Sequence, residues 1–409
     1  MQTVLLAAGD GTRLDTLADR TPKPLLPVAG EALVVRAARS AVEAGATELY
    51  VVVPPDHRRF ADRLGRSVDG APVTYVVQPR PMGTAEALRK AGRHVDGDFA
   101  VVCADSIYDT ASLARIFERV PSVGVVPDEA GRQDRAGRPA AVGDGGALNV
   151  DAIEAAPPEE RVHTGACSFP AEAGDWLDVP VSDRGERELA DVLTQVGRTQ
   201  DVATVEHETY VDVDRPWDLL RATELVLAEQ AGHEDGPLVE GDVADGARLR
   251  GPVRVAPGAT VRAGVVVEGP VVVDGGATVG PNAYLEPATY VGPDVHVGHG
   301  VSVENSVLLA GTSIGHNVTL AYSVVGEDVT VGAGTTVAHR RHDGGHVAAR
   351  ADGEYVSTGR RRFGVVAGSR ASIAVDTTIG AGVTLEPGTR TEPGERVVGD
   401  DRGPAASGP

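Results

Sequence analysis

Residues 255–279 read VAPGATVRAGVVVEGPVVVDGGATV, and every sixth residue, beginning with Val255, is valine. The same spacing continues on both sides as twelve consecutive valine or leucine residues: Val243, Leu249, Val255, Val261, Val267, Val273, Val279, Leu285, Val291, Val297, Val303 and Leu309. A helix repeats every 3.6 residues and a strand every two, so neither produces a period of six. A hexapeptide repeat with one apolar residue per unit predicts a parallel β-helix, whose coils have three flat faces with the apolar residues pointing inward.

The repeat is predicted to occupy residues 238–397. Its phase slips at Ile314 and Leu320, resumes at Val325, and returns at Ile373 after an irregular insertion over residues 338–364. Residues 398–409 are expected to be a disordered tail. Because the flat faces and open ends of such a prism need covering, we expect a homo-oligomer.

Residues 1–230 follow a different pattern, in which apolar strands alternate with helices. The runs TVLLAA, ELYVVVP, VTYVVQP and FAVVCAD indicate buried strands of a mainly parallel sheet covered on both faces. The first predicted helix, EALVVRAARSAVEAG, has its apolar positions on one side and ends at Gly45, which can adopt positive φ. Residues 231–237 are predicted to be a linker.

The composition excludes several classes of protein. The chain has 409 residues and a net charge of −21, which argues against nucleic-acid binding. No apolar run approaches the ~20 residues of a membrane span, and a strand beginning at residue 3 leaves no room for a signal peptide. The two cysteines, Cys103 and Cys167, are expected to be free thiols. We therefore expect a cytoplasmic protein, with an acidic, lysine-poor composition typical of salt-loving archaea.

A glycine-rich turn follows the first strand, in the stretch LAAGDGTRLDTLADRTPKPLLPVAG at residues 6–30. The turn is neither a Walker loop nor a complete dinucleotide fingerprint, but its backbone N–H groups can converge on an anion. Arg13 follows directly, and Lys23, one of only two lysines in the chain, lies ten residues further on. Lysine provides a compact point charge suited to phosphate, so we expect a phosphate site here.

These residues resemble the opening signature of the sugar-1-phosphate nucleotidylyltransferases. Further matches follow in order: Gln78 with PMGTAEAL, AVVCAD, TGACSF, RGERELADVL and VDVDRPWDLL. The resemblance covers residues 1–230. With the β-helix included, the chain is similar to archaeal relatives of the bifunctional UDP-N-acetylglucosamine pyrophosphorylase/glucosamine-1-phosphate acetyltransferase. It implies a Rossmann-like nucleotidyltransferase domain followed by a left-handed β-helix, and assembly as a trimer.

The resemblance also implies a reaction and its residues. A sugar-1-phosphate oxygen attacks the α-phosphorus of UTP or dTTP, forming a nucleotide sugar and releasing pyrophosphate, with Mg²⁺ as cofactor. The implied catalytic residues are Arg13, facing the pyrophosphate, and Lys23, bridging the reacting phosphates. The remaining roles are nucleotide binding by Ala8, Gly9, Gly11, Thr12, Gln78, Gly83 and Thr84, sugar binding by Glu154 and Gly165, and metal binding by Asp105 and Asp212.

Several positions depart from the family pattern. The lysine expected to hold the sugar phosphate is Ala155, and the asparagine expected before TG is His163. Ala104 replaces a glycine before the metal aspartate. An arginine of the segment 128–138 could substitute for the missing lysine, the candidates being Arg132, Arg135 and Arg138.

In the bifunctional relatives the β-helix acetylates an amino sugar phosphate with acetyl-CoA, and His316 is the implied catalytic base. Other positions match poorly: Glu286 and Glu304 stand where relatives have an arginine and a lysine, and Thr319 and His339 replace a tyrosine and an asparagine. Three interpretations remain open: a nucleotidylyltransferase with a scaffolding β-helix, a bifunctional enzyme, and a non-catalytic sugar-nucleotide-binding protein.

Overall fold

A computed structural model of the chain describes residues 1–9, 11, 14–18, 21–80, 82–127, 161–182, 185–233, 236–351 and 353–399. The chain forms two compact units that are not consecutive in sequence. The first unit comprises Met1–Asp10, Lys23–Leu25 and Ala32–Asp212, and the second comprises Gly11–Pro22, Leu26–Glu31 and Val213–Pro409. The domain boundaries inferred from the sequence remain predictions.

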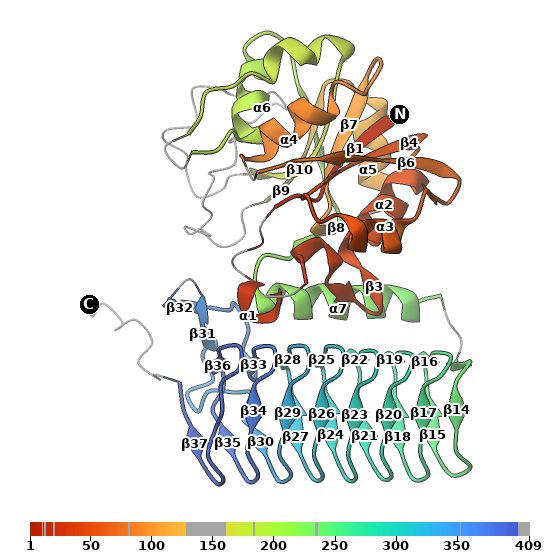
Figure 1. Cartoon of the computed structure of the whole chain (residues 1–409), viewed down its shortest axis with the longest axis vertical. Coiled ribbons are helices and arrows are strands. Elements are labelled where there is room, and N and C mark those ends of the chain that lie inside the picture. The colour runs from red at the N-terminus through yellow and green to blue at the C-terminus, as the bar shows by residue number, and fades with distance from the viewer. Residues whose placement is uncertain are drawn as a thin grey trace. The chain divides into compact units, whose positions relative to one another are not determined.

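The first unit is built on a mixed sheet with a parallel centre (Figure 1). Neighbouring strands run in the order β11 (Ala203–Glu206), β9 (Ser122–Pro127), β10 (Arg161–Phe169), β7 (Phe99–Cys103), β1 (Gln2–Leu6), β4 (Glu48–Val53), β6 (Ala71–Val77) and β5 (Ser67–Val68). Strands β7, β1, β4 and β6 are parallel, whereas β10 is antiparallel to both of its neighbours. The predicted mainly parallel α/β domain is confirmed.

Helices cover both faces of this sheet because alternate strand residues point to opposite sides. Leu5 and Val51 belong to a core cluster with residues of α2 (Leu33–Glu43), α3 (Arg58–Leu64) and α5 (Thr110–Glu118). Val4 and Val52 belong to a second cluster with residues of α4 (Thr84–Ala91) and α6 (Leu189–Gly197). Gly45 follows α2 with φ of +109°, as the sequence predicts.

The second unit contains a left-handed parallel β-helix whose coils build three parallel sheets (Figure 1). One sheet contains β13 (Leu238–Val239), β16 (Val253–Val255), β19 (Val271–Val273), β22 (Thr289–Val291), β25 (Val307–Leu308), β28 (Val324–Val325), β33 (Val366–Ala367) and β36 (Thr384–Leu385). The next contains β14 (Asp242–Val243), β17 (Thr260–Val261), β20 (Thr278–Val279), β23 (His296–Val297), β26 (Ser313–Ile314), β29 (Thr330–Val331) and β34 (Ser372–Ile373). The third contains β15 (Arg248–Arg250), β18 (Val266–Glu268), β21 (Tyr284–Leu285), β24 (Ser302–Glu304), β27 (Thr319–Ala321), β30 (Thr336–Val337), β35 (Thr378–Ile379) and β37 (Arg396–Val397).

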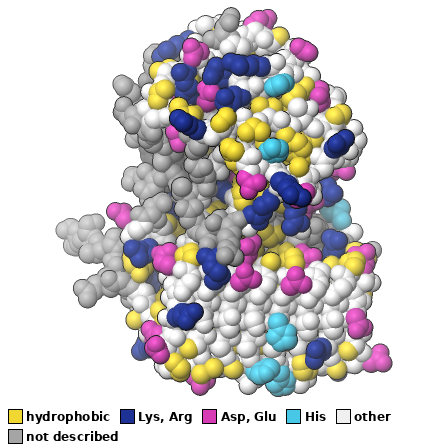
Figure 2. Space-filling view, viewed as in Figure 1, with side chains coloured by type: hydrophobic (Ala, Val, Ile, Leu, Met, Phe, Trp, Pro, Cys, Tyr) yellow, Lys and Arg dark blue, Asp and Glu magenta, His cyan; other side chains and the backbone are white. Residues whose placement is uncertain are grey.

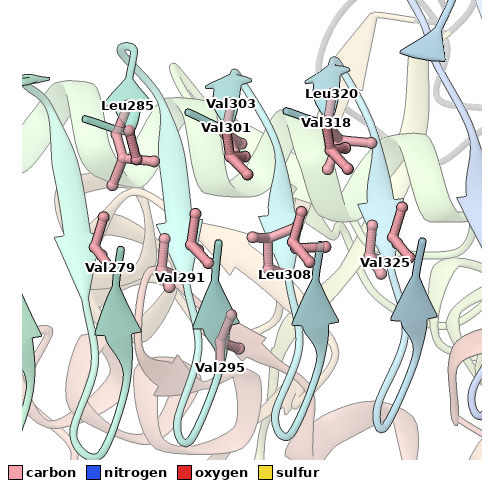
Figure 3. Packing of buried hydrophobic residues seen from close by; sticks show 14 of the residues in the cluster. Val279, Leu285, Val291, Val295, Val301, Val303, Leu308, Val318, Leu320 and Val325 are labelled. Carbon is pink, nitrogen blue, oxygen red and sulfur yellow. The ribbon is translucent and has the colours of Figure 1, made fainter. Parts of the chain in front are cut away.

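The repeated valines and leucines fill the interior of the prism (Figure 3). Val255 pairs with Val273, and Val273 with Val291, so each coil stacks an apolar residue on the one before. The phase slip lies one hexapeptide earlier than predicted, because Val291 pairs with Leu308 rather than with Leu309. Leu309 is also buried, but it lies outside the interior cluster.

The insertion predicted at residues 338–364 contains an antiparallel hairpin of β31 (Ala348–Ala351) and β32 (Glu354–Ser357). Strand β28 pairs with β33 across it, so the regular coils resume after the hairpin. Helix α7 (Pro216–Ala231) belongs to the same unit, where its Trp217 ring packs edge-on against Phe363.

From Gly264 onward, one corner of the β-helix alternates glycine with asparagine or aspartate from coil to coil, all with positive φ: Gly264, Asn282, Gly300, Asn317, Gly334, Asp376 and Gly394. These residue types adopt this conformation most readily. The asparagine and aspartate side chains lie over the glycine of the preceding coil, where a Cβ on Gly300 would come within 2.6 Å of Asn317 Oδ1.

Candidate active site

The candidate site of the first unit lies at the carboxyl edge of the parallel strands. Leu6 and Cys103 are register partners at the ends of β1 and β7, so the residues after each strand emerge side by side. Ala8 and Gly9 follow β1, and Asp105 follows β7. Open α/β sheets place their ligands at this edge.

Lys23 joins the two predicted metal ligands. It lies on the 3-10 turn Lys23–Leu25, is 6% exposed, and its Nζ is 2.8 Å from Asp105 Oδ2 and 3.7 Å from Asp212 Oδ1. Strand β12 (Tyr210–Asp212) pairs with β8 (Ser106–Tyr108), which sets Asp212 opposite Ser106, the neighbour of Asp105. Residues 23, 105 and 212 are therefore brought to one point, where one ammonium group faces two carboxylates.

The carboxylates of Asp105 and Asp212 suit a hard divalent cation, because Mg²⁺ is usually held by one or two carboxylates together with substrate phosphates. Within the described ranges the structure contains no group of three or more histidine, cysteine, aspartate or glutamate side chains that could hold a metal by itself. The pair fits a metal that shares its coordination with a phosphate ligand. Ala104 lacks positive φ, so its replacement of a glycine does not strain this turn.

The predicted nucleotide-binding residues Gln78, Gly83 and Thr84 also lie together. Gln78 is 4% exposed and its Nε2 donates to Gly83 O at 3.3 Å. Gly83 has φ of +92°, and a Cβ there would lie 2.2 Å from Arg187 O. Thr84 begins α4, and its Oγ1 accepts from Leu189 N–H at 2.8 Å. Arg187 and Leu189 belong to the RGERELADVL motif, so this motif contacts the PMGTAEAL motif that contains Gly83 and Thr84.

Gly165, a predicted sugar-binding residue, lies in an irregular part of β10 and packs against Cys103 at the end of β7, two residues before Asp105. It has φ of +76°, and a Cβ would lie 2.5 Å from Cys103 Sγ. Its N–H donates to His163 Nδ1 at 3.2 Å. Burial raises the pKa of the Cys103 thiol, and the charges of Asp105 and Asp212 raise it further. Both cysteines are free, as predicted.

A network of hydrogen bonds around Asp109, which the family motifs did not indicate, lies next to Gly165. Asp109 caps α5 by accepting from Ser112 N–H at 2.7 Å, and its Oδ2 is 3.2 Å from His207 Nδ1. The Tyr108 hydroxyl donates to Thr164 O at 2.9 Å, next to Gly165. Burial alone would raise the pKa of Asp109, but hydrogen bonds from His207 and Ser112 hold it below its usual value. Asp-x-x-Ser before an apolar helix was the available signal for the cap.

Several predicted residues lie outside the described ranges: Thr12, Arg13, Glu154, Ala155, Arg132, Arg135 and Arg138. Gly11 is described, belongs to the second unit, and has φ of +62°, with Leu14 N–H donating to its carbonyl at 2.9 Å.

In the β-helix, His316 is exposed and stands beside His299. The backbone N–H of His299 donates to His316 Nδ1 at 2.9 Å, and the two rings meet edge to face. A neutral ring that accepts at Nδ1 carries its proton on Nε2. In this neutral form the ring presents Nε2–H as a donor, and the role of His316 as a catalytic base stays a prediction. Figure 2 shows histidine side chains on the face of the β-helix.

Glu286 and Glu304, at the positions predicted for sugar-phosphate cations, belong to a column of glutamates that begins with Glu268. Glu268 pairs with Arg250 and Glu304 with Arg362, each at 3.3 Å. Glu286 stands between them, and burial followed by the charges of Glu304 and Glu268 raises its pKa.

Other residues of the predicted acetyl-transfer region have partners of their own. His339 stacks on Tyr322, and burial lowers its pKa. Arg360, in the basic segment GRRRFG, donates to Glu224 of α7. Thr319 is exposed. The negative column and these ion pairs leave this region poorly suited to a phosphate group.

The first unit has the fold of a nucleotidyltransferase, and the second unit contains a β-helix. Residues 2–131 match the family described as nucleotidyl transferase, and residues 267–357 match the one described as GMPPB C-terminal domain. None of the helices in the described ranges has the length and apolar character that a membrane crossing requires.

Curated relatives match the chain over its length. The bifunctional protein GlmU of Methanococcus maripaludis is 30% identical over 393 residues, which cover 94% of this chain and 92% of the relative. The bifunctional sugar-1-phosphate nucleotidylyltransferase/acetyltransferase of Sulfurisphaera tokodaii is 25% identical over 94% of each chain. The UTP–glucose-1-phosphate uridylyltransferase AglF of Haloferax volcanii is 32% identical over 50% of this chain and 88% of its own. The chain belongs to the sugar-1-phosphate nucleotidyltransferase family and is an enzyme.

Proposed function

We propose that the first unit transfers UMP or dTMP from UTP or dTTP to a hexose-1-phosphate. The placement of Lys23 between Asp105 and Asp212 carries this proposal, because a reaction between two phosphates needs positive charge and a metal site at one point. An oxygen of the sugar phosphate forms a bond to the α-phosphorus, the bond to the β-phosphate breaks, and pyrophosphate leaves with the electron pair.

The residues of this chain have separate tasks in the proposal. Asp105 and Asp212 would hold Mg²⁺, which neutralises charge on the phosphates when it is bound. Lys23 would bind oxygens of the reacting phosphates, and Arg13 would bind the pyrophosphate side. The nucleotide base lies against Gln78, Gly83 and Thr84, and the glycine turn at Ala8, Gly9, Gly11 and Thr12 binds the triphosphate. Glu154 and Gly165 bind the sugar.

The orientation of the Gln78 side chain bears on which nucleotide base is bound. Gln78 Nε2 donates to Gly83 O, which orients the amide so that Oε1 is its acceptor. Uracil and thymine both present an N3–H donor between two carbonyl groups. This pairing supports a pyrimidine nucleotide and does not distinguish UTP from dTTP.

For the β-helix we propose a scaffold that supports a homo-oligomer, with a trimer as the expected assembly. The donor arrangement of His316 and the carboxylates of Glu286 and Glu304 oppose binding and deprotonating an amino sugar phosphate. The enzyme is expected to work in the cytoplasm at high salt, where ions screen its net charge of −21.

Pyrophosphate release tests the proposal. UTP and dTTP are each combined with glucose-1-phosphate, glucosamine-1-phosphate and N-acetylglucosamine-1-phosphate in high KCl with Mg²⁺, and acetyl-CoA consumption is followed in parallel. Pyrophosphate from at least one pair, lost on Arg13→Ala or Lys23→Ala, is expected. Nucleotide binding without turnover in any pair would favour the non-catalytic interpretation, and acetyl-CoA consumption would refute the scaffold proposal.

A further inference from the structure

The second unit contains a stretch of the N-terminal sequence, Gly11–Pro22, folded against the β-helix. Helix α1 (Asp15–Ala18) is one turn long and lies next to β33. Leu14 and Leu17 are fully buried. Burying two leucine side chains gives this short segment the apolar contact that a single helical turn cannot provide for itself.

Ser369, in the turn after β33, holds the end of α1. Its backbone N–H donates to Thr16 O at 3.1 Å, and its hydroxyl donates to Leu17 O at 3.2 Å. The last carbonyls of a helix have no partner within the helix, and in a four-residue helix these include Thr16 O and Leu17 O. Ser369 is completely buried, so these bonds are shielded from water.

Glu327, in the turn after β28, makes a second attachment. The Thr21 hydroxyl donates to Glu327 Oε1 at 2.8 Å, and Thr21 is 4% exposed. Hydrogen bonds to an ionised carboxylate are stronger than neutral ones. Two neighbouring turns of the β-helix, more than 300 residues away in sequence, therefore bind the same short segment at two places, the end of α1 and Thr21.

We infer that Ser369 and Glu327 are positioning residues for nucleotidyl transfer. The segment they hold leads from Thr21 through Pro22 directly into Lys23. Their printed hydrogen bonds are to Thr16, Leu17 and Thr21, so each acts through the main chain that leads to Lys23. The inference rests on the proposed function, and it gives the β-helix a part in the chemistry of the first unit.

The test uses full-length variants that each remove one hydroxyl. Ser369→Ala removes the bond to Leu17 O, and Thr21→Val removes the bond to Glu327. Ser323→Ala and Thr377→Val are matched controls, because these buried β-helix hydroxyls donate to Ala321 O at 2.9 Å and to Ala374 O at 2.8 Å. Thr21→Ser keeps the hydroxyl and should restore wild-type kinetics.

Loss of one hydrogen bond changes the equilibrium between the positioned and unpositioned segment about three- to tenfold. We expect Ser369→Ala and Thr21→Val to lower kcat/KM for the nucleoside triphosphate by this factor. The KM for the sugar-1-phosphate should stay within about twofold, and the thermal midpoint should fall no further than in the controls. UTP binding by calorimetry should weaken in parallel.

Kinetics and UTP binding equal to those of the controls would overturn the inference, as would a loss that simply follows thermal stability and affects both substrates alike. Failure of the proposed function looks different: the wild type itself would release no pyrophosphate with any substrate pair. The calorimetric comparison still decides whether these residues position the phosphate-binding segment in that case.

Discussion

Replacing Lys23 by alanine should separate the two tasks of its ammonium group. Its side chain is 7% exposed, and those of Asp105 and Asp212 are 30% and 18% exposed. Removing one partner from a fully buried ion pair costs about 3–5 kcal/mol, and partial exposure of both aspartates reduces this to about 2–3 kcal/mol. For a unit of this size we expect the thermal midpoint to fall by about 4–12 °C.

Magnesium should act differently on the variant. In the wild type the ammonium group competes with a cation for the two carboxylates, whereas in Lys23→Ala the carboxylates repel each other and favour a metal. We therefore expect MgCl₂ to raise the midpoint of Lys23→Ala by several degrees more than that of the wild type, while pyrophosphate release stays at least about 100-fold lower.

Differential scanning fluorimetry across a MgCl₂ titration and a pyrophosphate assay measure both effects. Lys90→Ala is the matched control, because the only other lysine of the chain makes a more exposed pair with Glu86 at 3.6 Å. Its activity should be unchanged. Wild-type turnover in Lys23→Ala would refute the catalytic role, and equal magnesium shifts in both proteins would refute the competition between ammonium and metal.

Three further changes test other parts of the first unit. Gly83→Ala should raise the KM for the nucleoside triphosphate at least about tenfold, because the new Cβ would meet Arg187 O at positive φ; unchanged steady-state kinetics would contradict this. Asp109→Asn should cost about 1–2 kcal/mol at pH 7 in urea unfolding. The pKa of Asp109 is lower in the folded than in the unfolded protein, so its carboxylate stabilises the fold above the unfolded pKa of about 3.9, and this stabilisation is lost as the pH falls toward the folded pKa. The difference in unfolding free energy between wild type and Asp109→Asn should therefore be smaller at pH 3 than at pH 7. An equal difference at both pH values would contradict the lowered pKa. Because burial raises its pKa, Cys103 should react with iodoacetamide at pH 8 more slowly than free cysteine, as followed by mass spectrometry, and reaction at the free rate would show that it is accessible.

The β-helix could be predicted from the sequence because its period is local and each coil repeats the same demand for an inward apolar residue. The position of the phase slip could not. Leu308 and Leu309 are both apolar and both buried, and only pairing with Val291 in the neighbouring coil selects Leu308. Which of the two leucines points inward depends on hydrogen bonds between coils, and the spacing of apolar residues along the sequence does not reveal these bonds.

Contacts within the candidate site could be predicted where both residues belong to one sequence motif, as for Gln78 and Gly83. The ion pairs of Lys23 with Asp105 and Asp212 follow only from strand order, which places β12 beside β8. The bond from Thr21 to Glu327 joins residues 306 positions apart, and neither the motif of Thr21 nor the repeat around Glu327 indicates this contact. Contacts of this kind depend on how a short polar turn meets a particular coil.

The alternating corner of the β-helix limits how such a protein can change its length. Because each asparagine or aspartate lies over a glycine, the true repeat along this corner is a pair of coils. Losing one coil by a genetic deletion would stack two side chains or two glycines at the junction, whereas losing two coils would restore the alternation. A variant lacking the pair of coils around Asn282 and Gly300 should therefore melt at a higher temperature than one lacking a single coil, although it has lost more of its core.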